Sequence, residues 1–287
     1  MERHIITLSK EDHRFPEFLK NINNPPESLY CIGDVGLLNK PAVAVVGARK
    51  CSEYGRQVAL KIGEMLAFND IVTVSGMADG IDAAAHLGAL KNGGETIAVL
   101  GQGVDICYPK SNMQLYKRII KEGLIISEYP PGTGPKPYFF PQRNRIISAI
   151  SNAVTVVEAS SGSGSLITAE IAAEQGKEII AVPGNINSTY SIGCNKLIAD
   201  GAEIMTVPED ILRIIGIEPR MRSEELDNMG EDEIAIFNLL KKEGELSLEY
   251  LCKILKKEPS KVSGIITVME LKGLVSYQLG KIFIAKF

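Results

Sequence analysis

The sequence predicts an α/β protein with a doubly wound, mostly parallel sheet, followed by a small C-terminal domain. Three observations support this prediction. From residue 41 onward, short apolar runs that end in glycine or a polar residue alternate with segments of helical pattern. The runs are rich in Val and Ile on both faces, which is typical of a parallel sheet covered by helices on both sides. After residue 230 the pattern changes to three helices and a hairpin.

The larger domain is expected to span residues 41–215. Ligands of such sheets bind at the C-terminal ends of the strands, beside a switch in strand order. That edge is therefore where we look for a site. The expected strands are 42–47, 71–76, 96–101, 124–127, 154–159, 178–184 and 203–207, and the expected helices are 52–68, 80–91, 111–121, 145–151, 165–175, 193–200 and 208–214.

Two less regular segments flank this domain. Residues 1–40 are interpreted as a short N-terminal arm, with a Pro/Asn-rich turn before an edge-strand pattern at 29–32. Residues 216–230 have an excess of acidic over basic side chains and are interpreted as an acidic linker.

The C-terminal segment 231–287 matches the layout of a winged helix, a variant of the helix-turn-helix. Helices are expected at 234–241, 248–255 and 258–272, with Ser247 as a cap, Pro259 in a first turn and Gly273 as a stop, and the wing at 274–279 and 282–287. Nine basic residues face eight acidic ones between 229 and 287. Such a balanced charge is unfavourable for binding duplex DNA, so we expect this segment to contact a protein. A transcription factor that reads duplex DNA is the weaker alternative.

Composition excludes several classes of protein. The net charge is −4 over 287 residues, so any contact with nucleic acid must come from a local patch. No apolar run has the ~18 residues that a membrane span needs, and the polar start is unlike a signal peptide. The five scattered cysteines contain no CxxC pair, and we expect a cytoplasmic protein with neither disulfides nor a metal site.

The ends of the first two expected strands carry candidate ligand contacts. Gly47 lets the backbone approach an anion, Arg49 can grip a phosphate with two parallel hydrogen bonds, and Ser52 can cap the next helix. After the second strand, Asp82 is interpreted as a cap rather than a catalytic acid. His86 is one helical turn further on, within hydrogen-bonding reach of Asp82, and is interpreted as structural.

The most informative stretch is 139–151, FFPQRNRIISAIS. It follows a Pro/Gly-rich segment that we expect to form a long loop over the strand ends. Cations interleaved with aromatic rings suit single-stranded nucleic acid, because phosphates meet the cations and bases stack on the rings. A helix start at Arg145 would add free N–H donors beside the arginines. The candidate residues here are Lys136, Phe139, Phe140, Arg143, Asn144 and Arg145.

Two later strand ends add further donors. Gly162, Gly164 and Ser165 precede a helix, and Asn195 and Lys196 follow the turn after the sixth strand. One such end is common in α/β proteins. Five converging on one edge predict a site for a phosphate-bearing ligand.

Taken together, these motifs resemble the DNA-processing protein A (DprA/Smf) family. The resemblance covers about residues 40–210, with the motifs in family order: GAR at 47–49, SGMADGIDAAAH at 75–86, TIAVLGQGVDICYP at 96–109, ISEYPPGT at 126–133, FPQRNRIISAIS at 140–151, VVEASSGSGSLITA at 156–169, AVPG at 181–184 and SIGCNKLI at 191–198.

The resemblance implies an extended Rossmann domain that binds single-stranded DNA as a homodimer. It also implies protection of incoming strands and loading of the RecA recombinase during natural transformation, without a cofactor or nucleotide hydrolysis. By position, Arg49 is similar to the family's phosphate-gripping arginine, Lys136 and the Phe139/Phe140 pair to its cation and base-stacking aromatic, and Arg143 and Arg145 to its RNR motif. The short arm at 1–40 lacks the sterile-alpha-motif-like domain that many members carry, and Ala149 stands where glycine is more usual.

An enzyme or sensor acting on a nucleotide-like small molecule is the alternative. Related Rossmann-like phosphoribohydrolases use a PGGxGTxxE stretch. Here the comparable segment is SSGSGSLITAE, which ends in Glu170 but lacks that spacing. No nucleophile–base pair stands out either, so a binding protein is the preferred prediction.

Overall fold

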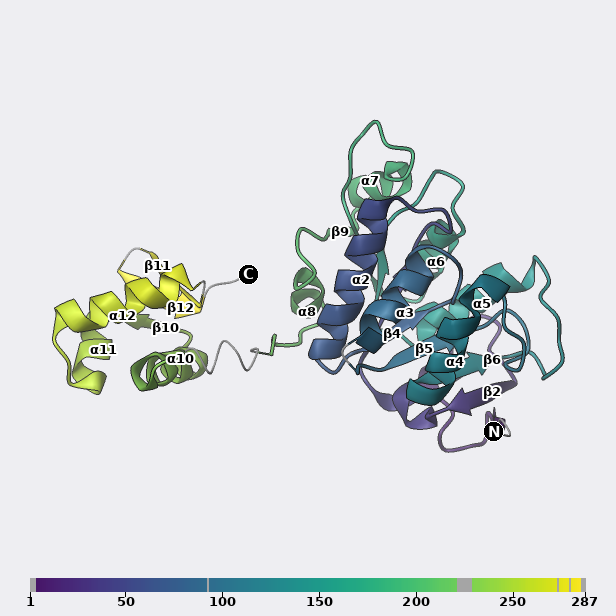
Figure 1. Cartoon of the computed structure of the whole chain (residues 1–287), viewed down its shortest axis with the longest axis horizontal. Coiled ribbons are helices and arrows are strands. Elements are labelled where there is room, and N and C mark those ends of the chain that lie inside the picture. The colour runs from purple at the N-terminus through teal and green to yellow at the C-terminus, as the bar shows by residue number, and fades with distance from the viewer. Residues whose placement is uncertain (1–3, 92, 221–228, 273, 279, 285–287) are drawn as a thin grey trace. The chain divides into compact units, whose positions relative to one another are not determined.

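The computed structural model describes residues 4–91, 93–220, 229–272, 274–278 and 280–284. It divides into two compact units, Met1–Pro219 and Arg220–Phe287 (Figure 1). Residues 221–228 of the predicted acidic linker, the predicted stop Gly273 and the end of the predicted wing lie outside the described residues. No helix among the described residues is long and apolar enough to cross a membrane.

A nine-stranded sheet in the order β1-β2-β6-β5-β4-β3-β7-β8-β9 forms the centre of the first unit. Strands β3 to β9 pair in parallel, whereas β1 and β2 add an antiparallel edge. The bounds are β1 Ile6–Ser9, β2 Ser28–Gly33, β3 Ala42–Val46, β4 Val72–Ser75, β5 Thr96–Val99, β6 Leu124–Ser127, β7 Ala153–Val156, β8 Glu178–Ala181 and β9 Glu203–Ile204.

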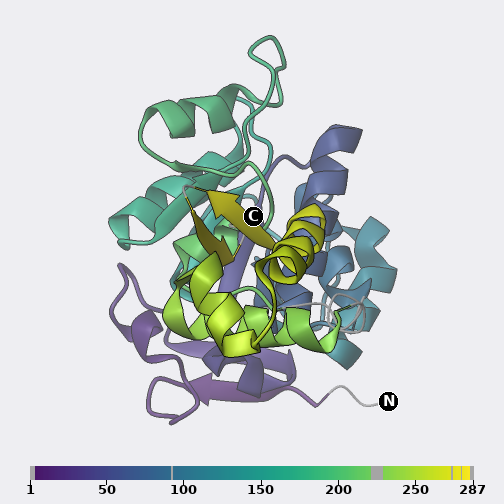
Figure 2. The ribbon, with the colours of Figure 1, turned by 90° about the vertical axis from the view of Figure 1, so that its left-hand side faces the viewer.

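Helices cover both faces of this sheet, as the apolar runs predict. One core layer packs α1, η1, α5, α6 and α7 against the sheet, and the opposite layers pack α2, α3, α4 and α8. The edge strands β1 and β2 and the helix α7 lie toward opposite ends of the sheet in both views (Figures 1 and 2). The bounds are α1 Glu17–Lys20, η1 Val35–Asn39, α2 Glu53–Phe68, α3 Ile81–Lys91, η2 Lys110–Asn112, α4 Met113–Glu122, α5 Phe139–Ala149, α6 Gly164–Glu174, α7 Ile192–Ala199 and α8 Asp210–Ile214.

The direction of strand order changes between β3 and β7, which are neighbours in the centre of the sheet. From β3 the chain proceeds through β4, β5 and β6 to one side, and from β7 through β8 and β9 to the other. The loops that leave β3 and β7 therefore diverge and leave space above the strand ends. Such a switch point is where open α/β sheets bind their ligands.

Two features differ from the sequence predictions. Residues 1–40 are more than an arm, because β1 and β2 pair with each other and extend the main sheet through β6. Helix α5 begins at Phe139, six residues before the predicted start at Arg145. Pro141 is tolerated as its third residue because the first four N–H groups of a helix have no intrahelical acceptor. Arg143 and Arg145 consequently lie inside the helix rather than at its N-terminus.

The second unit contains three helices and a three-stranded antiparallel sheet in the order β10-β12-β11. This element order is the one expected of a winged helix. Ser247 caps α11 and Pro259 begins α12, as predicted, whereas the short strand β10 was not predicted. The bounds are α10 Glu231–Glu243, β10 Glu245–Ser247, α11 Leu248–Leu255, α12 Pro259–Leu271, β11 Val275–Gln278 and β12 Lys281–Ile284.

Candidate nucleic-acid interface

A recess of about 410 Å³ opens above the C-terminal ends of β3 and β7. Residues from four segments line it: 46–50 at the end of β3, 78–82 after β4, 137–147 at the start of α5, and 160–168 at the start of α6. We call it the switch-point recess. The floor is buried and the rim is exposed. Of the predicted site residues, Gly47, Arg49, Phe140, Arg143, Asn144, Gly164 and Ser165 line the recess.

Arg49 lies on the rim of the switch-point recess and is exposed. Its guanidinium carbon is 5.3 Å from the centre of the Phe140 ring, a cation–π contact between the loop after β3 and the first turn of α5. Within the described part of the chain, no carboxylate lies within ion-pair distance of Arg49. The charge is therefore held in place and available to an anion.

Arg143 lines the recess from below, and only 5% of its surface is exposed. Its Nη1 donates to the carbonyl of Val99 (2.5 Å), and its Nε is buried with no hydrogen-bond partner among the described residues. Gly76 makes room for the guanidinium, since a Cβ there would come within 1.9 Å of Nη1. Burial lowers the pKa of Arg143 to about 10, which leaves it protonated at neutral pH, and Asp82 opposes that shift.

Asp82 lines the floor of the recess, whereas His86 is fully buried and does not line it. Asp82 accepts from the backbone N–H groups of Gly76 (3.1 Å) and Ala78 (3.4 Å), and burial raises its pKa although Arg143 opposes the shift. The predicted Asp82–His86 contact is not observed. Instead, His86 Nδ1 lies 2.6 Å from Thr96 Oγ1.

The imidazole of His86 is neutral. Thr96 Oγ1 donates its own proton to the carbonyl of Thr73 (2.7 Å), so it accepts from His86 and the imidazole proton is on Nδ1. Burial lowers the pKa of His86 to about 3, and the nearby Arg143 charge adds to that effect.

The N-terminus of α6 forms a second wall of the recess. Ser163 caps this helix through the N–H of Ser165, and the two hydroxyls lie 2.8 Å apart. Asn144 Nδ2 donates to the carbonyl of Gly164 (3.4 Å), which joins α5 to this wall. A Cβ on Gly162 or Gly164 would meet nothing within 4 Å. Neither glycine is therefore required by packing, and the backbone of Gly164 is open to a ligand.

Lys136 and Phe139 belong to an aromatic group beside the recess. Phe139 stacks on Tyr129, with ring centres 3.8 Å apart, and meets the edge of Tyr138 at 4.7 Å. The ammonium of Lys136 lies 5.3 Å from the centre of the Phe139 ring and 5.9 Å from that of Tyr138. The predicted interleaving of cations and rings is thus present in three dimensions.

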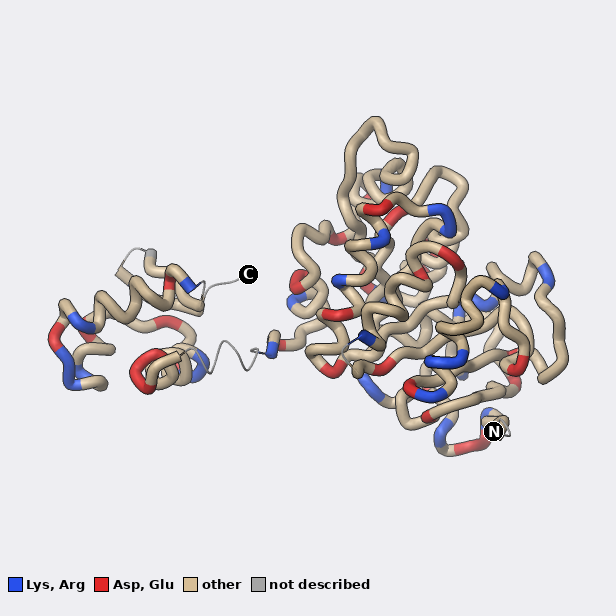
Figure 3. Tube along the Cα trace, viewed as in Figure 1, with Lys and Arg blue, Asp and Glu red and all other residues tan. Residues whose placement is uncertain are grey.

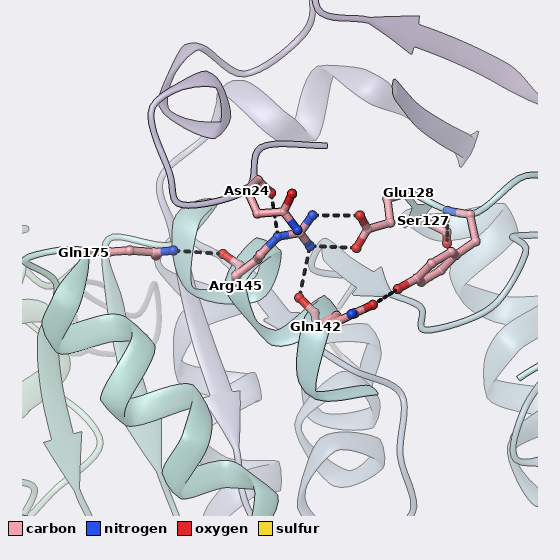
Figure 4. Close-up of polar contacts among 7 residues, drawn as sticks. Asn24, Ser127, Glu128, Gln142, Arg145 and Gln175 are labelled. Carbon is pink, nitrogen blue, oxygen red and sulfur yellow. Dashed lines mark hydrogen bonds and ion pairs between the residues drawn. The ribbon is translucent and has the colours of Figure 1, made fainter. Parts of the chain in front are cut away.

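Arg145 has a structural role instead of the predicted ligand contact. It is 8% exposed, and its guanidinium pairs with both carboxylate oxygens of Glu128 at 2.6 and 2.7 Å (Figure 4). It also donates to the carbonyls of Asn24 (2.8 Å) and Gln142 (3.0 Å). These bonds join α5 to the segments before β2 and after β6, and leave the guanidinium no free side for a phosphate.

Gly47 and Ser52 both lie against Glu158, Gly47 at its backbone carbonyl and Ser52 at its carboxylate. Ser52 caps α2 by accepting from the N–H of Gly55 (3.0 Å), as predicted. Its hydroxyl donates to Glu158 Oε1 (2.5 Å) and its N–H to Oε2 (2.9 Å), so both of its donors are used within the protein. Gly47 is needed for close packing, because a Cβ there would come within 2.7 Å of Ile81 and 3.0 Å of the Glu158 carbonyl.

The remaining candidates lie outside the recess lining. Asn195 exchanges two hydrogen bonds with the backbone of Gly184, accepting at 3.1 Å and donating at 2.9 Å, and so fixes the turn after β8. Lys196 is exposed on α7.

Sequence reasoning missed Tyr108 and Tyr129 of the aromatic group and the cation Lys50, whereas Tyr138 belongs to the predicted interleaving of cations and aromatic rings. Tyr108 stacks on Phe140 with ring centres 5.6 Å apart, Tyr129 and Tyr138 surround Phe139, and Lys50 lines the recess. The available signal was position, since Tyr108 and Tyr129 follow β5 and β6 on the edge where the other candidates gather. We call Tyr108, Tyr129, Tyr138, Phe139 and Phe140 the aromatic cluster.

The fold and this arrangement define a class: Rossmann-like α/β proteins with a cationic recess at the switch point. The family model described as DNA recombination-mediator protein A matches residues 6–216, and the chain belongs to that family. The DNA processing protein DprA of Streptococcus pneumoniae is 46% identical to this chain over 215 residues, 71% of this chain and 76% of the relative. The family predicted from the sequence motifs is confirmed.

Solved structures agree with the fold of the first unit. DNA processing protein A from S. pneumoniae matches with a TM-score of 0.71 and 44% identity over 76% of this chain and 75% of that chain. The protein of the same name from Helicobacter pylori, whose structure gives insight into a unique single-stranded DNA binding mode, matches with a TM-score of 0.67 and 31% identity over 74% and 95%. The predicted α/β fold class is therefore confirmed.

Proposed function

We propose that this chain binds single-stranded DNA along the switch-point recess and the aromatic cluster, and that it loads the RecA recombinase onto the bound strand. In this proposal it acts without a chemical step of its own, protects incoming strands in the cytoplasm and serves recombination during natural transformation. One observation carries the proposal. Arg49 and Lys136 are exposed and lie against aromatic rings, and no carboxylate among the described residues forms an ion pair with either of them. The Helicobacter relative and the recombination-mediator family support the same ligand and process.

Local placement of charge matters because the protein as a whole is slightly acidic. Lys and Arg are interspersed with Asp and Glu along both units (Figure 3). In the second unit, Lys257 pairs with Asp232, Lys272 with Glu233 and Lys281 with Glu245. We therefore assign strand binding to the first unit and a protein contact to the second.

Fluorescence anisotropy with labelled oligo-dT tests the assignment. We expect the wild type to prefer the single strand over a duplex of equal length. Arg49→Ala should weaken binding more than tenfold, whereas the control Arg56→Ala removes the same charge from an exposed side chain of α2 and should have little effect. With about three phosphate contacts, log Kd should change with log salt with a slope of about 2, and Arg49→Ala should lower that slope by about 0.7. Equal affinities for wild type and Arg49→Ala would contradict the proposal.

The recombinase part of the proposal has its own measurement. The rate of RecA filament formation on DNA coated with single-strand-binding protein should rise when this protein is added, and Arg49→Ala should reduce that effect. If strand binding is normal but filament formation is unchanged, recombinase loading fails while the DNA assignment remains.

We propose a homodimer as the working form. Strand β9 is the last strand of the sheet, and Ile204 on it and the nearby Val207 are exposed. An open strand edge with apolar side chains is a template for pairing with a second chain. Analytical ultracentrifugation should give twice the monomer mass, and Ile204→Lys should shift the protein to monomer. A wild type that sediments as a monomer at micromolar concentration would contradict this.

A small nucleotide-like ligand is the second candidate, and the size of the recess favours it. Its volume of about 410 Å³ falls within the range of small-molecule pockets, roughly 300–1,000 Å³. Calorimetry with nucleoside monophosphates distinguishes the two candidates. Micromolar binding of a mononucleotide together with no binding of oligo-dT would favour the enzyme or sensor.

A further inference from the structure

The two phenylalanines of the aromatic cluster form an inner layer. Phe140 is flanked by Tyr108 and by the Arg49 guanidinium, and a Cβ on Gly101 would come within 2.9 Å of its ring. Phe139 is stacked on Tyr129 and meets Tyr138 and the Lys136 ammonium. Both phenylalanines are only partly exposed. Neither ring is the one that a base would meet first.

The outer layer is formed by tyrosines. Tyr108 is 41% exposed and rests on Phe140, and Tyr138 is 55% exposed and rests on Phe139. Large exposed aromatic side chains need a reason when they are stacked into a group rather than scattered singly. The Lys136 ammonium lies 5.9 Å from the centre of the Tyr138 ring, and the Arg49 guanidinium lies against Phe140, the ring on which Tyr108 rests.

We infer that Tyr108 and Tyr138 are two base-stacking positions, each paired with a phosphate-binding cation, and that Phe139 and Phe140 support them from beneath. This inference rests on the proposed single-stranded DNA function. A nucleotide carries an anionic phosphate and a flat base a few bonds apart, which matches Lys136 beside Tyr138, and Arg49 and Tyr108, which both contact Phe140. Stacking is tolerant of sequence, since every base has a π face, and needs bases released from a duplex.

The inner layer explains how the rings are oriented. The planes of the Tyr108 and Phe140 rings are 27° apart, so the inner ring sets the orientation of the outer ring that is stacked on it. Lys136 lies near both Phe139 and Tyr138, so a phosphate that draws Lys136 outward remains beside the exposed ring. Removal of a phenylalanine should therefore loosen the tyrosine above it, whereas removal of a tyrosine should remove a stacking surface and leave the cation in place.

Binding to two oligomers of equal phosphate count tests the inference. One is oligo-dT and the other is an abasic strand of the same length. Tyr108→Ala and Tyr138→Ala should each weaken binding to oligo-dT about tenfold and leave binding to the abasic strand unchanged. Tyr108→Phe and Tyr138→Phe keep the ring and should bind oligo-dT like the wild type. Tyr54→Ala removes a tyrosine of similar exposure, 56%, from α2 and serves as the control.

The outcomes separate this inference from the proposed function. If the wild type prefers oligo-dT to the abasic strand and both tyrosine-to-alanine variants retain that preference, the tyrosines are not stacking positions although strand binding stands. Equal losses on both strands would likewise overturn the inference, because they would show a structural or phosphate-related effect. If the wild type binds neither strand, the proposed function itself fails.

Discussion

The two faces of helix α5 use buried arginines in different ways. Arg143 and Arg145 are two residues apart and similarly buried, at 5% and 8% exposure. Arg145 makes four hydrogen bonds, two of them to one carboxylate. Among the described residues, Arg143 donates one hydrogen bond to a carbonyl, has Asp82 as a neighbouring charge and keeps an Nε without a partner.

Two residues in a helix are about 200° apart around its axis, which is why such neighbours meet different surroundings. On one face, the charge of Arg145 is paired with Glu128 and stabilises the fold. On the other, the guanidinium lines the recess and keeps an Nε without a partner among the described residues. The comparison teaches that two arginines of similar burial differ in hydrogen-bond satisfaction, and we propose that this difference separates a structural arginine from a binding one.

The largest effect is expected on the structural face. Arg145→Met leaves Glu128 without its partner in a site where its side chain is only 17% exposed, and should lower the free energy of unfolding by about 3 kcal/mol. Urea denaturation measures this. The double variant Arg145→Met/Glu128→Leu should recover most of the loss, because replacing both charges leaves none unpaired. Oligo-dT affinity per folded molecule should remain that of the wild type, and a tenfold loss of affinity would break the comparison.

The face of α5 that carries Arg143 should respond in the opposite sense, with a large loss of affinity and a small loss of stability. Arg143→Ala should weaken oligo-dT binding more than tenfold and cost less stability than Arg145→Met, because Arg143 gives up one hydrogen bond rather than four. Anisotropy and urea denaturation on the same preparation measure both quantities. If Arg143→Ala destabilises the protein as much as Arg145→Met and leaves affinity unchanged, then both arginines are structural.

The pH dependence of stability tests the recess face further. The folded pKa of His86 is about 3, below the 6.5 of an ordinary histidine, so the unfolded chain binds more protons between these values. Stability should therefore fall as pH drops below about 6.5, by about 1 kcal/mol between pH 7 and 5.5. His86→Asn should lose this slope. Asp82, whose pKa is raised, acts in the opposite direction and is present in both proteins. Parallel curves for the two proteins would contradict the assignment.

The smallest effect concerns a methyl group on the wall of the recess. Gly164→Ala adds a Cβ where no atom lies within 4 Å, so stability should stay the same or rise slightly. A phosphate that approaches this backbone would be obstructed, and oligo-dT affinity should fall about threefold. Gly162→Ala is the matched control, since Gly162 has equal space but does not line the recess. Equal behaviour of the two variants would argue against a ligand at the α6 N-terminus.

Local features of this chain were predictable from its sequence, and long-range partners were not. The caps at Ser52 and Ser247 and the strand β6 follow from neighbouring residues alone. Arg145 was misassigned because its partners Glu128 and Asn24 are 17 and 121 residues away. The start of α5 was missed because two aromatics and a proline favour a loop locally, whereas burial of Ile146 and Ile147 against the sheet stabilises the helix. Tyr108 and Tyr129 were overlooked for the same reason as Glu128, because the rings on which they stack belong to another segment of the chain.

The rings beneath Arg49 and Lys136 also affect the thermodynamics of binding. Long cationic side chains normally lose rotamer freedom when they meet a phosphate, at about 0.5–1.5 kcal/mol each. Here Phe140 and Phe139 already lie against the two side chains before any ligand arrives, and we expect these contacts to narrow their rotamer freedom. Less entropy remains to be lost on association, so replacing either ring by leucine should make the entropy of binding more unfavourable even where the charges and the recess are intact.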